Sequence, residues 1–267
     1  MLLLDILNAL IRRQSMIYIA TGERSFASEV YSLSKNDPFG CRIVSLYNTY
    51  DYNLPFVDFW VQLVKGEAVS LIARLETAFI LRLTRKSDLD EVSSFLRVSG
   101  ANSIICDGRY ILRLPLNKVE GPVLYSKSEF EITEDFKVIT PSVKDVYSIL
   151  EKCTSKNFAV PPYESFALDV SNKLNKKTAR VYAVYDKAPS ACIMTLAEST
   201  DCAVFGALAT DPEYRGKGLG GFLIKYINNI LVNEGKTVFL HRAPDENISF
   251  YNKLGFKRYG IWNEYYE

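Results

Sequence analysis

The pattern of apolar and polar residues changes period within the carboxyl-terminal half of the chain. Ala203 to Ala209 is a continuous apolar run, which is typical of a buried strand. Pro212 ends this strand, because proline cannot donate to the hydrogen-bond ladder. Beyond a glycine-rich turn, apolar residues recur with the spacing of an amphipathic helix, at Leu219, Phe222, Leu223, Tyr226, Ile227, Ile230 and Leu231. The pattern therefore predicts a unit of strand, glycine-rich turn and helix.

Similar patterns predict the other elements of this half. Strands are expected at 136–139, 180–185, 192–198 and 237–241, with aromatic closing strands within 256–266. Helices are expected at 143–153, 163–174 and 246–254. Asp245 is the expected cap of the last helix, and Gly255 is expected to end it.

The amino-terminal half has a less regular pattern. Strands are expected at 16–20, 42–47, 68–73, 78–83 and 103–106. Helices are expected at 3–14, at 25–33 and after Ser87, which we interpret as the cap of the third helix. Pro115, Gly121 and Pro122 interrupt the segment 112–130, which is typical of a domain boundary. We therefore expect an α/β domain over 1–130 and a second domain over 131–267.

The composition is that of a globular protein with a substantial core. Of the 267 residues, 48% are hydrophobic and 24% are charged, and the formal net charge is +1. A charge so close to zero does not favour nucleic acid as a partner. The five cysteines show no CxxC spacing and indicate reduced thiols, and the single histidine, His241, excludes a multi-histidine metal site.

The apolar stretches do not have the pattern of a signal peptide or a membrane span. Met1 to Leu10 carries Asp5, and its positive charges follow the apolar part, which is the wrong order for a secretory signal. Leu54 to Val64 is too short to cross a bilayer. We therefore expect a soluble, cytoplasmic protein with no membrane partner.

The glycine-rich turn has the physical properties of an anion site. The first N–H groups of a helix lack internal partners and lie at the positive end of its dipole. Gly216, Gly218 and Gly220 remove the Cβ atoms that would keep a ligand away from those groups. Arg215 and Lys217 add positive charge beside them. The turn is therefore predicted to bind a pyrophosphate.

The glycine spacing distinguishes between families of anion-binding turns. Gly221-Phe222 stands where a P-loop has Lys-Ser or Lys-Thr, and a dinucleotide-binding turn would have a different glycine spacing. The pattern Arg-x-x-Gly-x-Gly over 215–220 instead resembles the coenzyme A pyrophosphate loop of the GNAT superfamily of N-acetyltransferases. Residues 208–212 resemble the end of the strand that precedes this loop in that family. The sequence Tyr-x-Lys-Leu-Gly-Phe over 251–256 resembles the motif found toward the end of the family's domain.

The resemblance implies the GNAT fold, an α/β (α+β) arrangement with a mixed central sheet flanked by helices, and acetyl-CoA as the cofactor. The residues implied to contact the cofactor are Leu208, Ala209, Thr210, Arg215, Gly216, Lys217, Gly218, Leu219, Gly220 and Asn247. Asn247 departs from the family pattern, in which an asparagine commonly stands at the position occupied here by Pro244.

The resemblance also implies catalytic roles. Tyr251 would protonate the leaving thiolate, and the alternative is a tyrosine that packs beneath the cofactor. The strand 203–209 lacks the glutamate that the family often uses as a base. His241 is a candidate base, because the unperturbed pKa of histidine, about 6.5, suits that role, while Glu198 and an ordered water chain are alternatives. No cysteine lies in the motif region, so no covalent acyl-enzyme is expected.

The predicted function is N-acetyl transfer from acetyl-CoA to a primary amine of a small metabolite or amino-acid-like acceptor. Transfer is expected to be direct, in a ternary complex, by a monomer or homodimer. The alternative is a non-catalytic acyl-CoA-binding or protein-interaction protein. The amino-terminal half is either a degenerate GNAT-like domain or an unrelated α+β domain. Its segment 83–91 has no glycine and three carboxylates, which would repel a pyrophosphate.

Overall fold

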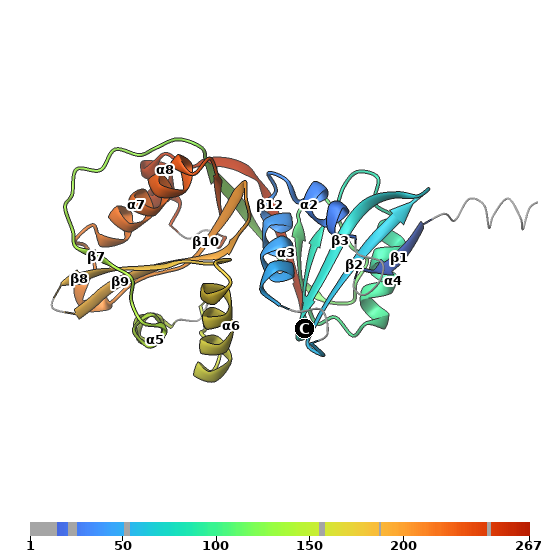
Figure 1. The fold of residues 1–267 in the computed structure, drawn as a ribbon, viewed down its shortest axis with the longest axis horizontal. Helices are drawn as coiled ribbons and strands as arrows, with labels where there is room; N and C mark the ends of the chain where they lie inside the picture. Colours follow the sequence, from blue (N-terminus) through green and yellow to red (C-terminus); the bar gives the residue numbers. More distant parts are fainter. Residues whose placement is uncertain (1–14, 21–25, 51–53, 155–157, 187, 245–246) are drawn as a thin grey trace, which may run out of the picture.

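The computed structural model describes residues 15–20, 26–50, 54–154, 158–186, 188–244 and 247–267 (Figure 1). The helix expected at 3–14 and the expected cap Asp245 lie outside these ranges, so both remain predictions.

The strands form one mixed sheet that runs through the whole molecule. In chain order they are β1 (Ser15–Ile19), β2 (Val57–Val64), β3 (Glu67–Leu75), β4 (Ala78–Arg82), β5 (Ser103–Asp107), β6 (Asn117–Ser126), β7 (Val138–Ile139), β8 (Val181–Asp186), β9 (Ala188–Glu198), β10 (Cys202–Thr210), β11 (Thr237–His241) and β12 (Lys257–Tyr266). Across the sheet the order is β1-β2-β3-β4-β5-β12-β6-β11-β10-β9-β8-β7. The pairs β4–β5 and β10–β11 are parallel and the neighbouring pairs are antiparallel, which confirms the predicted mixed sheet.

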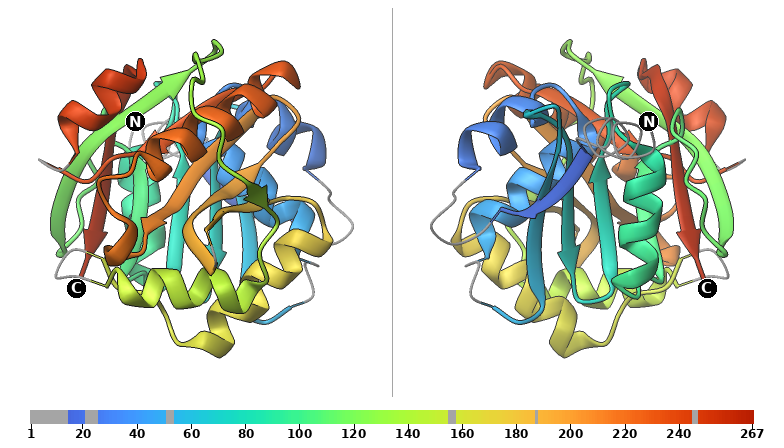
Figure 2. Two further views of the ribbon diagram at one scale, coloured as in Figure 1. Left: turned by 90° about the vertical axis from the view of Figure 1, so that its left-hand side faces the viewer. Right: turned by 90° about the vertical axis from the view of Figure 1, so that its right-hand side faces the viewer.

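Helices cover both faces of this sheet (Figures 1 and 2). They are α2 (Ala27–Ser34), α3 (Pro38–Thr49), α4 (Leu89–Val98), α5 (Val143–Lys152), α6 (Tyr163–Asn175), α7 (Leu219–Asn233) and α8 (Ile248–Leu254), with a short 3-10 turn η1 (Pro212–Tyr214). The helices α2, α3, α5 and α6 pack on one face, and α4, α7 and α8 pack on the other. None of the helices in the described residues is long and apolar enough to cross a membrane.

The two halves of the chain exchange their last strands. β6, from the amino-terminal half, pairs with β11 of the carboxyl-terminal half and places Val123 opposite His241. β12, at the carboxyl end, pairs with β5 and places Trp262 opposite Asp107. β6 and β12 also pair with each other along their length. The expected boundary at residue 130 falls in the connection after β6, and the strands on both sides of it belong to one sheet.

The two halves repeat one order of elements, except that α8 has no counterpart between β5 and β6 in the described residues of the amino-terminal half. The amino-terminal half has the order β1-α2-α3-β2-β3-β4-α4-β5-β6, and the carboxyl-terminal half has the order β7-α5-α6-β8-β9-β10-α7-β11-α8-β12. Their strand orders across the sheet match as well, because β1-β2-β3-β4-β5-β12 corresponds to β7-β8-β9-β10-β11-β6. This repetition favours a degenerate copy of the same fold in the amino-terminal half over an unrelated α+β domain.

The strand predicted at 42–47 is wrong, because this segment lies within helix α3. The side chain of Asp37 caps the helix by accepting hydrogen bonds from the N–H groups of Phe39 and Gly40, and Pro38 occupies the first turn. Most residues of α3 are buried, so the helix has no continuous polar face that would show its period in the sequence.

Two other details differ from the expectation. The cap of α4 is Asp88, whose side chain accepts from the Glu91 N–H at 3.0 Å, whereas the Ser87 hydroxyl accepts from Ser70 at 2.6 Å. The region 256–266, in which more than one closing strand is expected, forms the single strand β12. The strand that pairs with β12 on the side of the carboxyl-terminal half is β6. The sequence does not predict β6, because Gly121 and Pro122 indicate a loop when they are considered without the strands that flank them.

Candidate active site

The turn between β10 and α7 depends on two glycines with left-handed backbone. Gly216 has a φ of 77° and Gly218, the N-cap of α7, has a φ of 83°. Residues that carry a Cβ atom rarely adopt such angles. No heavy atom lies within 4 Å of the position that a Cβ would take at either glycine. The first N–H groups of α7 therefore face space that a ligand can enter.

A cavity of about 800 Å³ lies against this turn. Its lining residues come from β10, the turn, α7, α8 and the region between α5 and α6, and they are Cys153, Phe158, Leu208, Ala209, Thr210, Tyr214, Arg215, Gly216, Gly218, Leu219, Gly220, Gly221, Asn247, Phe250 and Tyr251. The structure thus brings together Tyr251 and every residue that the sequence assigned to the cofactor except Lys217.

Positive charge gathers at the mouth of the cavity. The ammonium of Lys217 lies 4.6 Å from the ring centroid of Tyr214, and the Arg215 Nε donates to the Thr210 carbonyl at 3.3 Å. The carboxylate of Asp211, next to the turn, is paired with Lys152 at 2.6 Å, and this lysine lowers the pKa of Asp211. The charge of Asp211 is therefore neutralised, while the two cations remain beside the helix start.

β10 has a bulge where it borders the cavity. Its register with β9 shifts between Gly206 and Ala209, and Ala207 has a left-handed φ of 49°. The parallel pairing with β11 ends at Phe205 and Leu240. Beyond this point the edge of β10 that faces away from β9 is not paired with β11. Its backbone polar groups are therefore available to a ligand in the cavity.

Tyr251 is held in the cavity by other aromatic rings. It lies on α8, with ring centroids 5.0 Å from Phe250 and 6.2 Å from Phe256. Burial raises the pKa of Tyr251, and the nearby Arg242 guanidinium partly opposes this effect. Within the described part of the chain, its hydroxyl makes no hydrogen bond. The phenol is therefore protonated at neutral pH and can donate to a ligand.

His241 ends β11 but does not line the cavity. Its imidazole packs on Phe39 of α3, and its Nε2 has no hydrogen-bond partner among the described residues. Burial, with a contribution from the charge of Arg42, lowers the pKa of His241 to about 3. Such an imidazole is neutral at physiological pH and resists protonation, which does not suit a general base.

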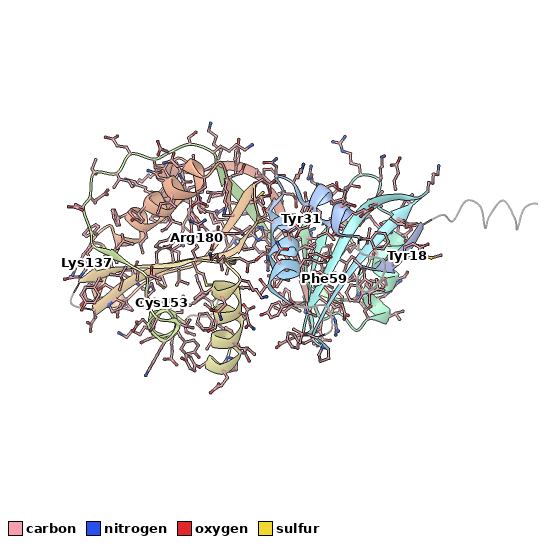
Figure 3. The ribbon with its side chains drawn as sticks, viewed as in Figure 1. Tyr18, Tyr31, Phe59, Lys137, Cys153 and Arg180 are labelled. Atoms are coloured by element: carbon pink, nitrogen blue, oxygen red, sulfur yellow. The ribbon has the colours of Figure 1, made fainter. Side chains whose placement is uncertain are left out.

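Glu198 is the last residue of β9 and pairs with Ala203, near the start of β10. The cavity lies at the other end of β10. The Glu198 carboxylate accepts from Thr195 at 2.8 Å and pairs with Arg180 at 2.8 Å and Lys236 at 2.6 Å. Arg180 is labelled in Figure 3. The structure therefore places Glu198 in an ion-pair network and does not bring it to Tyr251.

Asn247 lines the cavity with a backbone that is unusual for its residue type. It has a φ of 53° and is the N-cap of α8, one turn before Tyr251. Asparagine tolerates this left-handed conformation better than most residues. The position fits a cap, and the residue also faces the space in which a ligand would lie.

Several residues of the cavity were not indicated by the sequence, namely Cys153, Phe158, Tyr214, Gly221 and Phe250. Cys153 follows α5 on the face of the sheet opposite α7 (Figure 3). Its Sγ lies 3.3 Å from the Thr210 carbonyl oxygen and 3.7 Å from the Arg215 Nη2. A thiol thus lies in the cavity although the motif region contains none, because only the fold brings the end of α5 to the end of β10.

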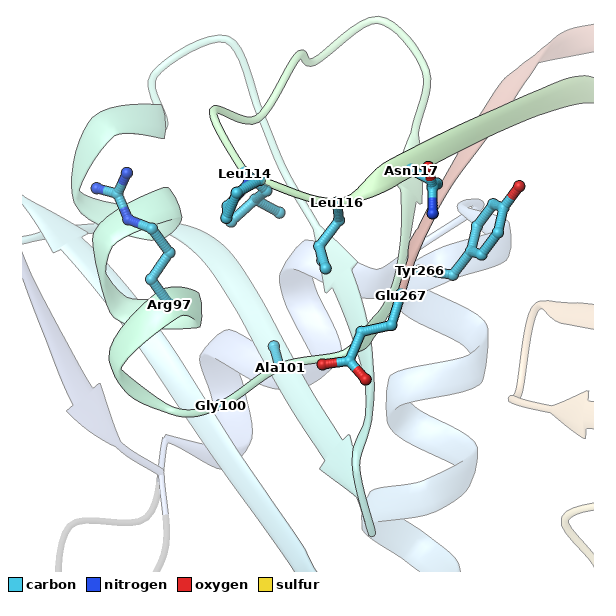
Figure 4. Close-up of a pocket in the computed structure, with 9 residues that line it drawn as sticks. Arg97, Gly100, Ala101, Leu114, Leu116, Asn117, Tyr266 and Glu267 are labelled. Carbon is cyan, nitrogen blue, oxygen red and sulfur yellow. The ribbon is translucent and has the colours of Figure 1, made fainter.

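The described residues contain another cavity of comparable volume, about 820 Å³, in the amino-terminal half (Figure 4). It lies beside the carboxyl end of α4 and is lined by Arg97, Ala101, Leu114, Leu116 and Glu267, among others. The carboxyl end of a helix is the negative end of its dipole, and Glu267 adds a carboxylate. This cavity therefore does not suit a pyrophosphate.

The start of α4, which corresponds to the start of α7 in the repeat, is filled by the protein's own groups. Glu91 accepts from the Gln62 Nε2 at 2.7 Å and from Ser15, and Asp88 caps the helix. Gln62 is fully buried. A carboxylate thus occupies the position in which an anion would bind, and the described segment 83–91 at the start of α4 has no equivalent of the turn at 215–220.

The comparisons with known proteins agree with this geometry. The family model described as "Acetyltransferase (GNAT) domain" matches residues 177–258. No curated protein matches the sequence. The fold is similar to a tandem GNAT protein from the clavulanic acid biosynthesis pathway, with a TM-score of 0.58 and 13% identity over 94% of this chain and 97% of that one.

Two further solved structures have similar folds. A GNAT-family acetyltransferase from Colwellia psychrerythraea has a TM-score of 0.52 and 10% identity, over 94% of this chain and 100% of that one. A GCN5-related N-acetyltransferase from Kribbella flavida has a TM-score of 0.52 and 13% identity, over 73% and 85% of the two chains. The carboxyl-terminal half of this chain therefore contains a GNAT acetyltransferase domain, and the chain as a whole has the fold of tandem GNAT proteins.

Proposed function

We propose that the protein transfers an acetyl group from acetyl-CoA to a primary amine of a small metabolite or amino-acid-like acceptor. The observation that carries this proposal is the cavity of about 800 Å³, in which an open helix start, two flanking cations, an unpaired strand edge and a tyrosine hydroxyl meet. The family match over 177–258 includes the strand, the turn and Tyr251.

Each part of the cavity suits a different part of acetyl-CoA, which would supply the acetyl group as a thioester. The N–H groups at the start of α7, with Arg215 and Lys217, would hold the pyrophosphate. The unpaired edge of β10, from Leu208 to Thr210, would hold the chain that carries the thioester and donate N–H groups to its carbonyl oxygen.

Tyr251 would give its proton to the departing sulfur. Because burial raises the pKa of Tyr251, its phenol is protonated when the carbon–sulfur bond breaks and can donate to the negative charge that develops on the sulfur. The rings of Phe250 and Phe256 fix the direction of the Tyr251 side chain, so this side chain loses little rotational freedom when the ligand binds.

We propose that the acceptor amine loses its proton to water. An alkylammonium has a pKa of about 10 in water, so a neutral fraction is always present. His241 resists protonation, and Glu198 is engaged in ion pairs at the other end of β10. Cys153 lies beside Arg215, which we assign to the pyrophosphate, so the proposal is direct transfer without an acyl-enzyme.

Calorimetric titration with acetyl-CoA, followed by an assay of thiol release with a panel of primary amines, tests this function. We expect saturable binding, weaker binding of an analogue that lacks the pyrophosphate, and thiol release that depends on the amine. Binding without release for any amine would support the non-catalytic alternative, and absence of binding would overturn both.

A further inference from the structure

A cavity of about 190 Å³ lies between the two halves of the chain. Its lining from the amino-terminal half comes from β3, β4, β5 and α3, and α3 lies where the two halves meet (Figure 1). Its lining from the carboxyl-terminal half comes from α6, β9 and the exchanged strand β12. None of these lining residues lines the larger cavity beside the turn at 215–220, so this is a separate space.

The sheet directs the carboxylate of Glu264 into this cavity. Glu264 of β12 pairs with Ile105 of β5, and Ile105 pairs with Ile80 of β4. Residues opposite one another on neighbouring strands point to the same face of a sheet, and Ile80 belongs to the core cluster that includes the buried residues of α3. The next residue, Tyr265, packs in the cluster on the α4 face. Glu264 therefore points toward α3, beside two isoleucines.

Arg42 enters the same cavity from the opposite side. It lies on α3, is partly buried, and lines the cavity together with Ser45 and Leu46, which follow at helical spacing. Burial lowers the pKa of the Arg42 guanidinium, and the charge of Glu264 opposes this effect. Within the described ranges, the side chains of Arg42 and Glu264 make no hydrogen bond or ion pair. Two opposite charges thus face one cavity without pairing with each other.

The third charged group of this cavity already has a partner. Lys173 of α6 is paired with Asp169 at 2.8 Å, and its side chain is only 12% exposed. The cavity therefore keeps one guanidinium and one carboxylate that are unpaired among the described residues. Removing charged groups from water costs free energy unless each finds a partner. A ligand that carries both an anionic and a cationic group would supply the two partners.

We propose that this cavity binds a small α-amino acid, with its carboxylate beside Arg42 and its ammonium beside Glu264. A guanidinium presents a fork of N–H donors that matches the two oxygens of a carboxylate. A space of about 190 Å³ equals the volume of about six water molecules, which suits an amino acid with a small side chain. Tyr251 does not line this cavity, so the bound amino acid is distinct from the acetyl acceptor.

Ligands that differ by one charged group test the proposal, in titrations without acetyl-CoA that do not depend on the proposed acetyl transfer. Calorimetry compares L-alanine with propionate, which lacks the ammonium, and with ethylamine, which lacks the carboxylate. We expect L-alanine to bind at least about tenfold more tightly than either, given the strength of hydrogen bonds to charged groups. L-Tryptophan should bind more weakly than L-alanine, because the cavity is small. No binding of L-alanine, or equal binding of propionate or ethylamine, overturns the proposal.

Two substitutions in the cavity locate the bound amino acid. Arg42→Gln and Glu264→Gln should each lower the affinity for L-alanine by about 10- to 100-fold. Glu76→Gln is the matched control, because Glu76 is exposed on the turn between β3 and β4 and does not line the cavity. This control should bind L-alanine like the wild type.

Thermal unfolding of the same proteins gives a second readout. A single cooperative transition shows that a variant is folded, and L-alanine should raise its midpoint in the wild type and in Glu76→Gln. The shift should be lost in Arg42→Gln and Glu264→Gln. If either of these two variants kept the full affinity for L-alanine, the amino acid would bind elsewhere, such as the acceptor site beside Tyr251, and the proposal would be wrong.

Discussion

The imidazole of His241 lies against the phenyl ring of Phe39, with ring centroids 5.2 Å apart and planes inclined by 31°. Phe39 belongs to α3 of the amino-terminal half, and His241 ends β11 of the carboxyl-terminal half. The contact removes the imidazole from water and directs it away from the larger cavity. His241, a candidate base from the sequence, is thus part of the packing between the two halves of the chain.

This burial of His241 makes the stability of the protein depend on pH. The folded pKa of about 3 lies below the unfolded value of about 6.5, so the unfolded state binds more protons between these values. The free energy of unfolding should therefore rise with pH in this window, by up to about 1.4 kcal/mol per unit, and become independent of this group above about pH 6.5.

Chemical denaturation at several pH values between about 4 and 8 checks this expectation, with His241→Gln as the comparison. The variant should show a shallower slope below about pH 6.5 than the wild type. Equal slopes for the two proteins would mean that His241 has an ordinary pKa in the folded state.

The same residue allows a kinetic prediction. If water takes the proton of the amine, kcat/KM should rise with pH toward the pKa of the amine, about 10, without a break near 6.5. His241→Gln should then keep kcat within a factor of about three, because loss of a general base costs about 100-fold or more. A loss of that size, together with a lost inflection in the pH profile, would restore His241 as the base.

Replacing Tyr251 by phenylalanine removes the proposed acid and keeps its ring. We expect kcat to fall by about 100-fold or more, because a positioned acid contributes at least that factor. The affinity for acetyl-CoA should change little, because the packing on Phe250 and Phe256 is kept. Steady-state kinetics and calorimetry measure the two effects separately. An unchanged kcat would reduce Tyr251 to a packing residue.

Gly218→Asp should abolish binding of acetyl-CoA by placing a carboxylate at the start of α7. Gly218 has a φ of 83°, so any side chain also strains the backbone. Gly218→Ala introduces that strain without charge, and Gly235→Asp repeats both changes at a φ of 81° near the other end of α7.

Calorimetric titration of these three variants separates charge from strain. We expect Gly235→Asp to bind like the wild type and Gly218→Ala to bind more weakly, with binding lost only in Gly218→Asp. If Gly218→Asp kept its affinity, the pyrophosphate would have to bind elsewhere.

The sequence predicted those parts of the fold and site whose cause is local. The turn at 215–220 was predictable because glycine geometry and a helix start determine it together, and the period of α7 was visible over its whole length. Three features depended on distant contacts. α3 is buried on most sides, Cys153 reaches the cavity only through packing of α5 on β10, and β6 is a strand only because β11 and β12 flank it.

The exchange of strands also predicts a position at which the chain is sensitive to an added methyl group. A Cβ at Gly121 would lie 2.6 Å from the Trp262 ring and 2.7 Å from the Arg242 carbonyl oxygen, between β12 and the segment after β11. Gly121→Ala should therefore lower the free energy of unfolding by about 1–3 kcal/mol, as expected for overpacking in a core.

Urea unfolding measures this loss, with Gly260→Ala as the control. Gly260 lies on β12 with no heavy atom within 4 Å of its Cβ position, and its φ is not left-handed, so its change should stay within about 0.5 kcal/mol. Because β6 and β12 connect the two halves, Gly121→Ala should lower the midpoint of one cooperative transition that includes both. If only one half were destabilised and two transitions appeared, the exchanged strands would not couple the halves.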